Sequence, residues 1–428
     1  MKVYLDSIGC RLNQSEIEKF AGQFRQAGHV IVDSAGEADV VVVNTCTVTS
    51  QAASDSRQKI RQAARAGDAE IVVTGCWSTL EPQAASMLPG VKRVVANPQK
   101  NGLVSTVLNL PEAVFDLEPL AREPLPGLHM RTRAFLKVQD GCDNHCTFCI
   151  TRIARGEGRS TPIQQIIAEV IAAQQGGANE VVLSGVHLGS WGSDFERPLH
   201  LFHLIGAILK ETDIPRLRLS SLEPWDLDET FFDLWENPRL CRHLHLPLQS
   251  GSAATLRRMA RKTTPESFAS LVQQARNVSD DMAITTDLIA GFPGETEAEF
   301  SESLQFVEQM EFAGGHVFTY SERPGTAAAR MAGSVAHEVR KQRSAMLRDV
   351  LAQSTRQFQK RQLGREVTVL WEATDSVGPQ GWRLHGLTDH YLKVTAFAPR
   401  RQWNQFSRVQ LIDLSDDSLL GILAGDDA

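Results

Sequence analysis

Short apolar stretches alternate with helical segments over three quarters of the chain, and this alternation limits the possible fold more than any other feature. Near the N-terminus the apolar stretches are residues 3–5, 40–43, 71–73 and 94–95. Residues 52–66 favour a helix, and Asn13, with Glu16 three positions later, is predicted to cap another whose apolar face carries Phe20 and Phe24. The all-valine run 40–43 is typical of a strand buried on both faces. The sequence therefore predicts an N-terminal open parallel α/β sheet.

One cysteine follows each of three predicted strands in this part, namely Cys10, Cys46 and Cys76. The carboxyl ends of parallel strands meet along one edge of an open sheet, where ligands bind. We therefore expect these three thiols to lie near one another although 30 to 36 positions separate them along the chain. The alternative is three unrelated core cysteines, because free cysteine is commonly buried.

The middle of the chain contains further strand-like stretches, at residues 135–138, 180–184, 217–221, 244–248, 284–290 and 316–320. Helical segments such as 163–173 and 298–310 separate them, which predicts a partial (βα)6 barrel that is open on one side. From residue 361 the pattern changes to short β stretches at 367–371, 392–395 and 409–414, punctuated by Gly381, Gly386 and Asp389. This pattern predicts a small antiparallel barrel or sandwich.

Residues 111–131 contain four prolines with acidic residues between them and are predicted to be a linker. The fold class is therefore α/β with a small all-β module at the C-terminus. The predicted domains are residues 1–115, 128–360 and 361–428.

The densest group of cysteines is Cys142-Asp-Asn-His-Cys146-Thr-Phe-Cys149. The next cysteine, Cys241, is 92 positions downstream, so no fourth thiolate stands nearby to close a tetrahedral site. Three thiolates on one loop can hold three irons of a cubane cluster and leave the fourth iron open to a substrate. The alternative is zinc, with His145 as the fourth ligand in strained local geometry.

The loop from Gly141 to Cys149 resembles the cluster loop of the radical S-adenosylmethionine enzymes. Segments 8–14, 43–48 and 74–76 resemble the three cysteine motifs of the methylthiotransferases within that superfamily, and so do segments 181–189, 245–251 and 287–295. The resemblance extends across essentially the whole chain. Segments 218–224 and 320–326 most resemble the branch that acts on threonylcarbamoyladenosine.

This resemblance implies an enzyme that adds a methylthio group to carbon 2 of N6-threonylcarbamoyladenosine at position 37 of tRNA. It implies two molecules of S-adenosylmethionine, one giving the methyl group and one the 5′-deoxyadenosyl radical. It also implies two [4Fe-4S] clusters, one on Cys142, Cys146 and Cys149 and an auxiliary one on Cys10, Cys46 and Cys76. Carbon 2 of adenine carries a C–H bond that no acid or base side chain can break at neutral pH, so no catalytic side chain is predicted.

Several residues at or near the ends of the predicted barrel strands are expected to contact S-adenosylmethionine: Ser184, Gly185, Ser221, Gln249 and Gly291. For Gly291, an ordinary turn without a ligand is the alternative. We expect His187, His243 and His245 to be satisfied or surface histidines rather than metal ligands. Cys241 is expected to be a buried thiol.

Two basic regions are candidates for contact with RNA. One is the predicted helix containing Arg340 and Lys341, for which a solvated basic face is the alternative. The other is the C-terminal module, which resembles a TRAM domain and carries Arg400 and Arg401. The implied partners are a tRNA anticodon loop and a reducing electron-donor protein.

Composition narrows the remaining choices. The net charge of −7 argues against a protein that coats nucleic acid non-specifically. No apolar run approaches the ~20 residues of a membrane span, and no secretory signal is visible, so we expect a cytoplasmic protein without a membrane partner. Rival functions are methylthiolation of isopentenyladenosine 37 or of a ribosomal-protein aspartate. A non-catalytic iron–sulfur protein that binds RNA or senses redox state is a further alternative.

Overall fold

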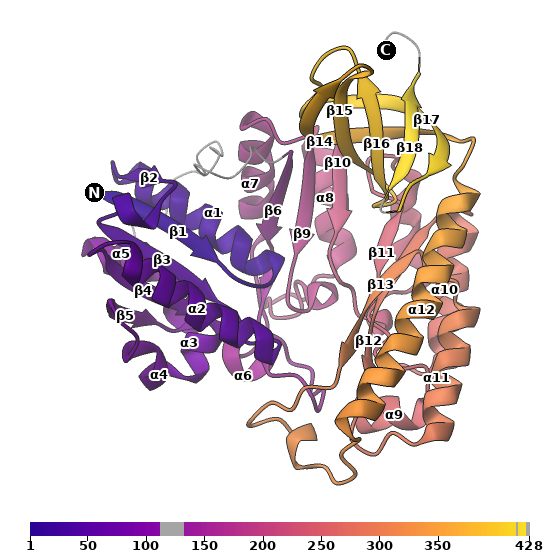
Figure 1. Ribbon diagram of the computed structural model, residues 1–428, viewed down its shortest axis with the longest axis horizontal. Helices are drawn as coiled ribbons and strands as arrows, with labels where there is room; N and C mark the ends of the chain where they lie inside the picture. The colour runs from indigo at the N-terminus through magenta and orange to yellow at the C-terminus, as the bar shows by residue number, and fades with distance from the viewer. Residues whose placement is uncertain (112–131, 417, 425–428) are drawn as a thin grey trace.

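The computed structural model describes residues 1–111, 132–416 and 418–424, and Figure 1 shows an N-terminal sheet, a central barrel and a C-terminal barrel. The predicted linker falls on residues 112–131, outside the described residues, apart from its first position. The domain boundaries at 115 and 128 fall there too, so the division into domains stays a prediction. None of the helices in the described ranges is long and apolar enough to cross a membrane.

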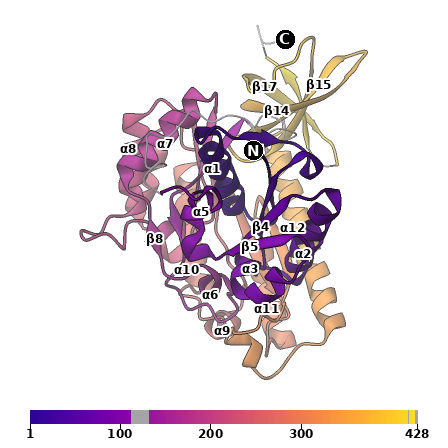
Figure 2. The same ribbon diagram turned by 90° about the vertical axis from the view of Figure 1, so that its left-hand side faces the viewer.

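The N-terminal sheet is five-stranded and parallel, with strand order β2-β1-β3-β4-β5. Its strands are β1 (Lys2–Ser7), β2 (Val30–Val32), β3 (Val40–Thr45), β4 (Glu70–Gly75) and β5 (Val91–Val95). Its helices are α1 (Arg11–Gln26), α2 (Ser50–Ala66), α3 (Cys76–Leu80), α4 (Pro82–Ser86) and α5 (Leu103–Leu108). Strand β3 is buried along its whole length, as the all-valine run predicts. Figure 2, viewed from this side of the molecule, shows the helices around the sheet. The predicted open parallel sheet is confirmed.

The start of α1 differs from the prediction. The helix begins at Arg11 with Cys10 at the N-cap position, so Asn13 lies inside the helix and is not its cap. The Asn13 amide is buried and donates hydrogen bonds to the carbonyls of Ile8 (2.8 Å) and Thr45 (3.0 Å). The side-chain amide of an asparagine can donate to any nearby carbonyl. A residue that is typical of helix caps therefore connects two loops here.

The central barrel consists of two parallel three-stranded sheets, in the orders β10-β9-β6 and β11-β12-β13. Single bridges from Leu217 to Leu240 and from Ser221 to His245 join them. The strands are β6 (Arg133–Lys137), β9 (Glu180–Ser184), β10 (Arg216–Leu219), β11 (His243–His245), β12 (Ala283–Ala290) and β13 (Gly314–Thr319). All of the predicted strands are present, and the predicted partial barrel is confirmed.

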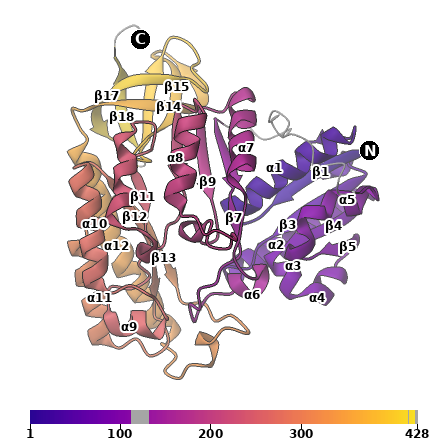
Figure 3. The same cartoon turned by 180° about the vertical axis from the view of Figure 1, so that it is seen from behind.

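Helices cover the outside of this barrel, as Figure 3 shows from behind. They are α7 (Ile163–Gln175), α8 (Leu201–Glu211), α9 (Ala253–Arg258), α10 (Pro265–Val278), α11 (Glu297–Gln309) and α12 (His337–Arg361). A short hairpin of β7 (Gln139–Asp140) and β8 (Arg159–Ser160) encloses α6 (Thr151–Arg155). On the other side, α1 of the N-terminal part packs against the edge strand β6.

The C-terminal strands form a closed barrel in the order β14-β15-β16-β18-β17. They are β14 (Glu366–Gly378), β15 (Gly381–Thr388), β16 (Lys393–Ala398), β17 (Phe406–Leu414) and β18 (Leu419–Leu423). The pairing of β16 with β18 is parallel, so the prediction of a purely antiparallel module is wrong there. Gly386 is also not a turn residue: it lies within β15, where a Cβ atom would overlap the Leu370 carbonyl.

The C-terminal barrel docks on the amino ends of the central strands. Arg216, the first residue of β10, donates to the Leu387 carbonyl (3.1 Å), and Arg218 donates to the Asp389 carbonyl (2.8 Å). The carboxyl ends of the same strands, which face away from this barrel, remain available for a ligand.

Candidate active site

The Cys142 loop leaves the carboxyl end of β6 through β7 and returns into α6. The Cys142 amide donates to the Gly156 carbonyl (3.0 Å). Thr147 fixes the middle of the loop, since its amide donates to the Met259 carbonyl (3.0 Å) and its hydroxyl to the Arg258 carbonyl (2.8 Å). Gly141 has φ 71° and a Cβ there would overlap the Glu157 carbonyl, so this position requires glycine. The three thiols are therefore presented, half-buried, by a loop that is fixed at both ends and in the middle.

Hydrogen-bond donors approach two of these thiols. The backbone N–H of Asn144 donates to Cys142 Sγ (3.4 Å), and Arg261 Nη1 lies 4.0 Å from Cys146 Sγ. Arg261 is itself buried and forms an ion pair with Glu223 (2.7 Å). Burial raises the pKa of the Cys146 thiol to about 11, although Arg261 opposes this shift. Donors of this kind stabilise the thiolate form and tune iron–sulfur clusters. Sequence reasoning missed Arg261, which no motif marks.

His187 is buried beside the same loop. Its Nε2 lies 2.6 Å from Asp226 Oδ2, and the Asn144 side chain contacts its ring. Burial favours the neutral ring, but the hydrogen bonds to Asp226 and Cys142 raise the pKa of His187 to about 10. His187 is thus a satisfied histidine, as predicted. His243 Nε2 and His245 Nδ1 both contact the Thr285 hydroxyl at 3.0 Å. The prediction holds for His245, whereas the buried His243 Nδ1 has no hydrogen-bond partner among the described residues.

Cys10, Cys46 and Cys76 follow β1, β3 and β4, which are adjacent parallel strands. Their loops are in contact: a Cβ atom on Gly9 would overlap the Cys46 side chain. Cys10 Sγ lies 3.8 Å from Asn13 Oδ1, and Asn97 Nδ2 lies 3.6 Å from Cys76 Sγ. Burial raises the pKa of the Cys46 thiol to about 11, and the neighbouring Cys10 and Cys76 thiols contribute to this shift.

The donor set of each group, three free thiols, fits an iron–sulfur cluster. All seven cysteines are free. In residues 1–111, 132–416 and 418–424, no three His, Cys, Asp or Glu side chains are arranged to hold one ion. The exposed His145 ring, considered above as a zinc ligand, contacts the Arg152 guanidinium instead. Three soft thiolates with N–H donors around them suit a four-iron cluster, whose irons are spread over a larger core.

A buried network of charges joins the two cysteine groups. Glu16 of α1 accepts hydrogen bonds from Lys100 (2.6 Å), Lys137 (3.0 Å) and Arg155 (3.0 Å). Arg155 also donates to Asp140 (2.8 Å), two residues before Cys142. Burial alone would raise the pKa of Glu16, but the three cations hold it well below its usual value. The sequence gives no sign of this network, because its members are up to 139 positions apart.

The predicted S-adenosylmethionine contacts all lie at or just beyond the carboxyl ends of β9 to β12. Ser184 is buried at the end of β9, and its hydroxyl has no hydrogen-bond partner among the described residues. Gly185 follows it, Ser221 is exposed after β10, and Gln249 has φ 72°. The amide of Gly291 donates to Glu295 Oε1 (3.0 Å), and the stem of Arg340 covers its Cα. A buried hydroxyl without a partner, such as that of Ser184, suits a polar ligand. Contact of these five residues with S-adenosylmethionine stays a prediction.

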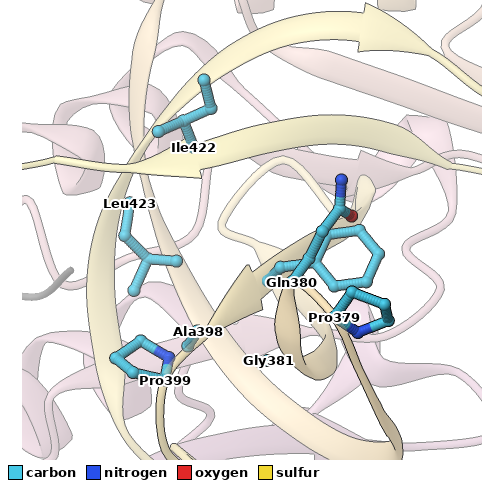
Figure 4. A pocket seen from close by; sticks show the side chains of 8 residues that line it. Pro379, Gln380, Gly381, Ala398, Pro399, Ile422 and Leu423 are labelled. Carbon is cyan, nitrogen blue, oxygen red and sulfur yellow. The ribbon is translucent and has the colours of Figure 1, made fainter.

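The predicted RNA contacts lie in two separate regions. Arg340 donates to the Tyr320 carbonyl (2.8 Å), whereas Lys341 is exposed on α12. Arg400 and Arg401 are exposed between β16 and β17, and the Arg401 guanidinium lies 4.3 Å from the centroid of the Trp382 ring. Near them, Pro379, Phe397, Pro399 and Ile422 line a shallow pocket of about 370 Å³ (Figure 4). Stacking surfaces beside arginines suit single-stranded nucleic acid, but RNA contact stays a prediction.

Comparisons with known families agree with this arrangement. Residues 2–96 match the family described as Uncharacterized protein family UPF0004, and residues 136–307 match the Radical SAM superfamily. Among solved structures, the radical S-adenosylmethionine methyltransferase TsrM from Kitasatospora setae has a TM-score of 0.60. It is 15% identical in sequence, and the match covers 77% of this chain and 75% of that one. At this identity the likeness shows the fold alone.

Curated relatives match over nearly the whole length. The threonylcarbamoyladenosine tRNA methylthiotransferase MtaB of Thermotoga maritima is 36% identical, with 99% of this chain and 97% of the relative covered. MtaB of Bacillus subtilis is 34% identical, with 92% and 89% covered. The tRNA-2-methylthio-N(6)-dimethylallyladenosine synthase of Maricaulis maris is 29% identical, with 99% and 97% covered. Because these relatives are enzymes, the alternative of a non-catalytic iron–sulfur protein is rejected. The chain belongs to the radical S-adenosylmethionine tRNA methylthiotransferases, and within them it is similar to the MtaB enzymes.

Proposed function

We propose that this methylthiotransferase modifies carbon 2 of N6-threonylcarbamoyladenosine at position 37 of tRNA, with two [4Fe-4S] clusters and two molecules of S-adenosylmethionine. The observation that carries the proposal is the pair of cysteine groups joined by Glu16, Arg155 and Asp140. One group follows the strands of the N-terminal sheet and the other follows β6. A reaction that removes a hydrogen atom from carbon 2 and also delivers sulfur to it needs two such sites within reach of one substrate.

The threonylcarbamoyl substrate is supported by the relatives. The MtaB proteins are 36% and 34% identical to this chain, against 29% for the dimethylallyladenosine synthase. The proposal includes the anticodon loop of a tRNA as partner, a reducing electron-donor protein, and a cytoplasmic location.

In this proposal the chain's own residues bind, orient and balance charge. Cys142, Cys146 and Cys149 would hold the cluster at the barrel mouth, and Cys10, Cys46 and Cys76 the auxiliary cluster. When bound, the clusters and S-adenosylmethionine supply radical chemistry that acid and base side chains cannot provide. The Arg261–Glu223 pair places a fixed cation beside Cys146, and the unpartnered Ser184 hydroxyl offers a hydrogen bond to the methionyl part of the cofactor.

Mass spectrometry of tRNA nucleosides from a strain that lacks the protein tests the proposal. The expected result is loss of the methylthio-threonylcarbamoyl nucleoside, with its return when the intact gene is supplied. Loss of the methylthio-isopentenyl nucleoside instead would assign the dimethylallyl substrate. An unchanged nucleoside profile with loss of a methylthio-aspartate would assign a ribosomal protein, and either result would reject the proposal.

A further inference from the structure

Arg323 is a buried cation whose guanidinium is only partly satisfied by the described residues. It lies in the turn after β13, and 9% of its surface is exposed. Its Nε and Nη2 atoms have no hydrogen-bond partner among the residues that the structure describes. The turn itself is well fixed, since the amide and the hydroxyl of Thr326 donate to the Arg323 carbonyl at 3.2 and 2.8 Å. A desolvated guanidinium without an anion is costly, so this position indicates a ligand of negative charge.

The turn that carries Arg323 lies against the Cys46 loop of the other part of the chain. Ser321 Oγ is 3.0 Å from Ser50 Oγ, at the start of α2 and four residues after Cys46. In agreement with this contact, burial lowers the pKa of Arg323 and the Cys46 thiol opposes this shift. The anion that Arg323 lacks is therefore to be sought at the N-terminal cysteine group.

A second arginine of the central part contacts residues around the same cysteine group. Arg155 of α6 is 1% exposed and donates to Asn13 Oδ1 (2.8 Å), the atom that lies 3.8 Å from Cys10 Sγ. Beside it, Asn97 links Cys76 Sγ (3.6 Å) to the Ala154 carbonyl (2.8 Å). The surroundings of Cys10 and Cys76 thus depend on α6, just as those of Cys46 depend on the turn after β13.

We propose that Arg155 and Arg323 complete the N-terminal cysteine site as fixed counter-charges, contributed by the central barrel, for an anionic iron–sulfur cluster and the sulfur that it passes on. The proposal rests on the proposed function. Three thiolates and a sulfur anion give such a site a net negative charge, and the two buried guanidinium groups balance it. Both are positioning residues, and the site is complete only when the two parts of the chain are docked.

The test uses the full chain with Cys142, Cys146 and Cys149 replaced by Ala, so that only the N-terminal cluster is present. Its midpoint potential is measured by EPR-monitored redox titration. Loss of a nearby positive charge disfavours the reduced cluster, so Arg323→Met is expected to make the potential more negative. Arg323→Lys, which keeps the charge, is expected to restore most of the shift. Arg356→Met, at an exposed position on α12, is the matched control and leaves the potential unchanged.

Two variants at the second arginine keep the test decisive if Arg323→Met loads iron poorly. Arg155→Lys retains a charge and is expected to hold its potential near that of the parent, whereas Arg155→Gln is expected to shift it in the same direction as Arg323→Met. An unchanged potential in fully loaded Arg323→Met and Arg155→Gln would overturn the proposal.

The holoenzyme gives a second measurement. In Arg323→Met, S-adenosylmethionine cleavage continues but sulfur delivery is impaired, so 5′-deoxyadenosine formed per methylthio nucleoside is expected to rise about tenfold, as for loss of one charge-assisted contact. An unchanged ratio would count against the proposal. Absence of any methylthio nucleoside with the unaltered enzyme would instead reject the proposed function, while the potential measurement would still test the counter-charges.

Discussion

The guanidinium of Arg11 donates a hydrogen bond of 2.5 Å to the phenolic oxygen of Tyr391, which joins the residue beside Cys10 to the C-terminal barrel. Tyr391 has φ 67° and stacks on His243 of β11, with ring centroids 5.0 Å apart. One side chain therefore contacts the N-terminal part, the central barrel and its own barrel.

This contact predicts a graded loss of stability at Tyr391. Tyr391→Phe removes one charge-assisted hydrogen bond and is expected to cost about 1.5 kcal/mol in the free energy of unfolding. Tyr391→Ala also removes a ring that lies within reach of the Arg11, Arg133 and Arg218 guanidiniums and is expected to cost about 3 kcal/mol or more. Urea unfolding measures both. A Tyr391→Ala protein as stable as the parent would show that the three parts are not joined at this residue.

Glu16 is predicted to be the most sensitive charged position outside the cysteine groups. Glu16→Gln keeps the shape of the side chain but leaves Lys100 without a carboxylate partner among the described residues, while Lys137 and Arg155 keep Asp140. Breaking a buried ion pair from one side costs about 3–5 kcal/mol. The exposed pair of Arg93 and Glu70 provides the control, since Glu70→Gln is expected to cost less than about 1 kcal/mol. Equal costs for the two variants would contradict the prediction.

The docking of the C-terminal barrel is predicted to weaken at alkaline pH. Buried His390 lies 2.9 Å from Asp281 and 3.1 Å from Asp389, with Arg242 next to both carboxylates. Burial favours the neutral ring, but the two carboxylates raise the pKa of His390 above its usual value. Its stabilising charge is therefore complete below about pH 6.5, the value for an unfolded chain, and is lost as the pH rises through the higher folded pKa.

Thermal unfolding of the parent and of His390→Gln between about pH 6 and pH 9 measures this effect, because the window lies around the ordinary histidine pKa. The parent is expected to lose stability over this range and the variant to lose less. His337→Gln, at an exposed position on α12, is expected to follow the parent. A variant with the same pH slope as the parent would assign the slope to other groups.

Ser184 is predicted to matter for ligand binding and not for folding. Its hydroxyl is buried without a partner in the described structure, so Ser184→Ala is expected to change the free energy of unfolding by less than about 0.5 kcal/mol. Loss of one hydrogen bond to the cofactor is expected to raise the KM for S-adenosylmethionine by about tenfold. Ser303→Ala is the matched control: its hydroxyl accepts from the Gly251 amide (2.8 Å), so that variant is expected to lose about 1 kcal/mol of stability with an unchanged KM.

Iron content is predicted to fall in two equal steps. Anaerobically prepared protein is expected to hold about eight irons per chain, and replacement of either cysteine group by Ala about four. Cys241→Ala is the control, because Cys241 is a buried thiol away from both groups, and it is expected to keep about eight. Four irons in the unaltered protein would reject the second cluster.

Local patterns account for most of the fold that was predicted. The valine run of β3 and the apolar residues of β12 mark buried parallel strands directly. The strands that were missed include β2, which is three residues long, β15, which contains Gly381 and Gly386, and the short β18. They form because neighbouring strands pair with them, which a single segment does not reveal.

The cysteine groups were predictable for a different reason than their surroundings. The spacing of Cys142, Cys146 and Cys149 is a local pattern, and the positions of Cys10, Cys46 and Cys76 follow from the strand ends. By contrast, Arg155 contacts Asn13 from 142 positions away, and the turn of Arg323 contacts Ser50 through Ser321 from 271 positions away; no periodicity marks such pairs. Asn13 shows the same limit, because a residue typical of helix caps serves instead to bridge two loops.

Helix α12 fixes the separation between two parts of the enzyme. Its 25 residues, at a rise of about 1.5 Å each, form a rigid strut of about 37 Å. Arg343 in its first half forms an ion pair with Glu295, just beyond β12. Near its other end, Phe358 packs in one apolar cluster with residues of the C-terminal barrel, which Figure 1 shows beside the end of the helix. The length of this one helix therefore sets the separation between the carboxyl ends of the central strands and the C-terminal barrel.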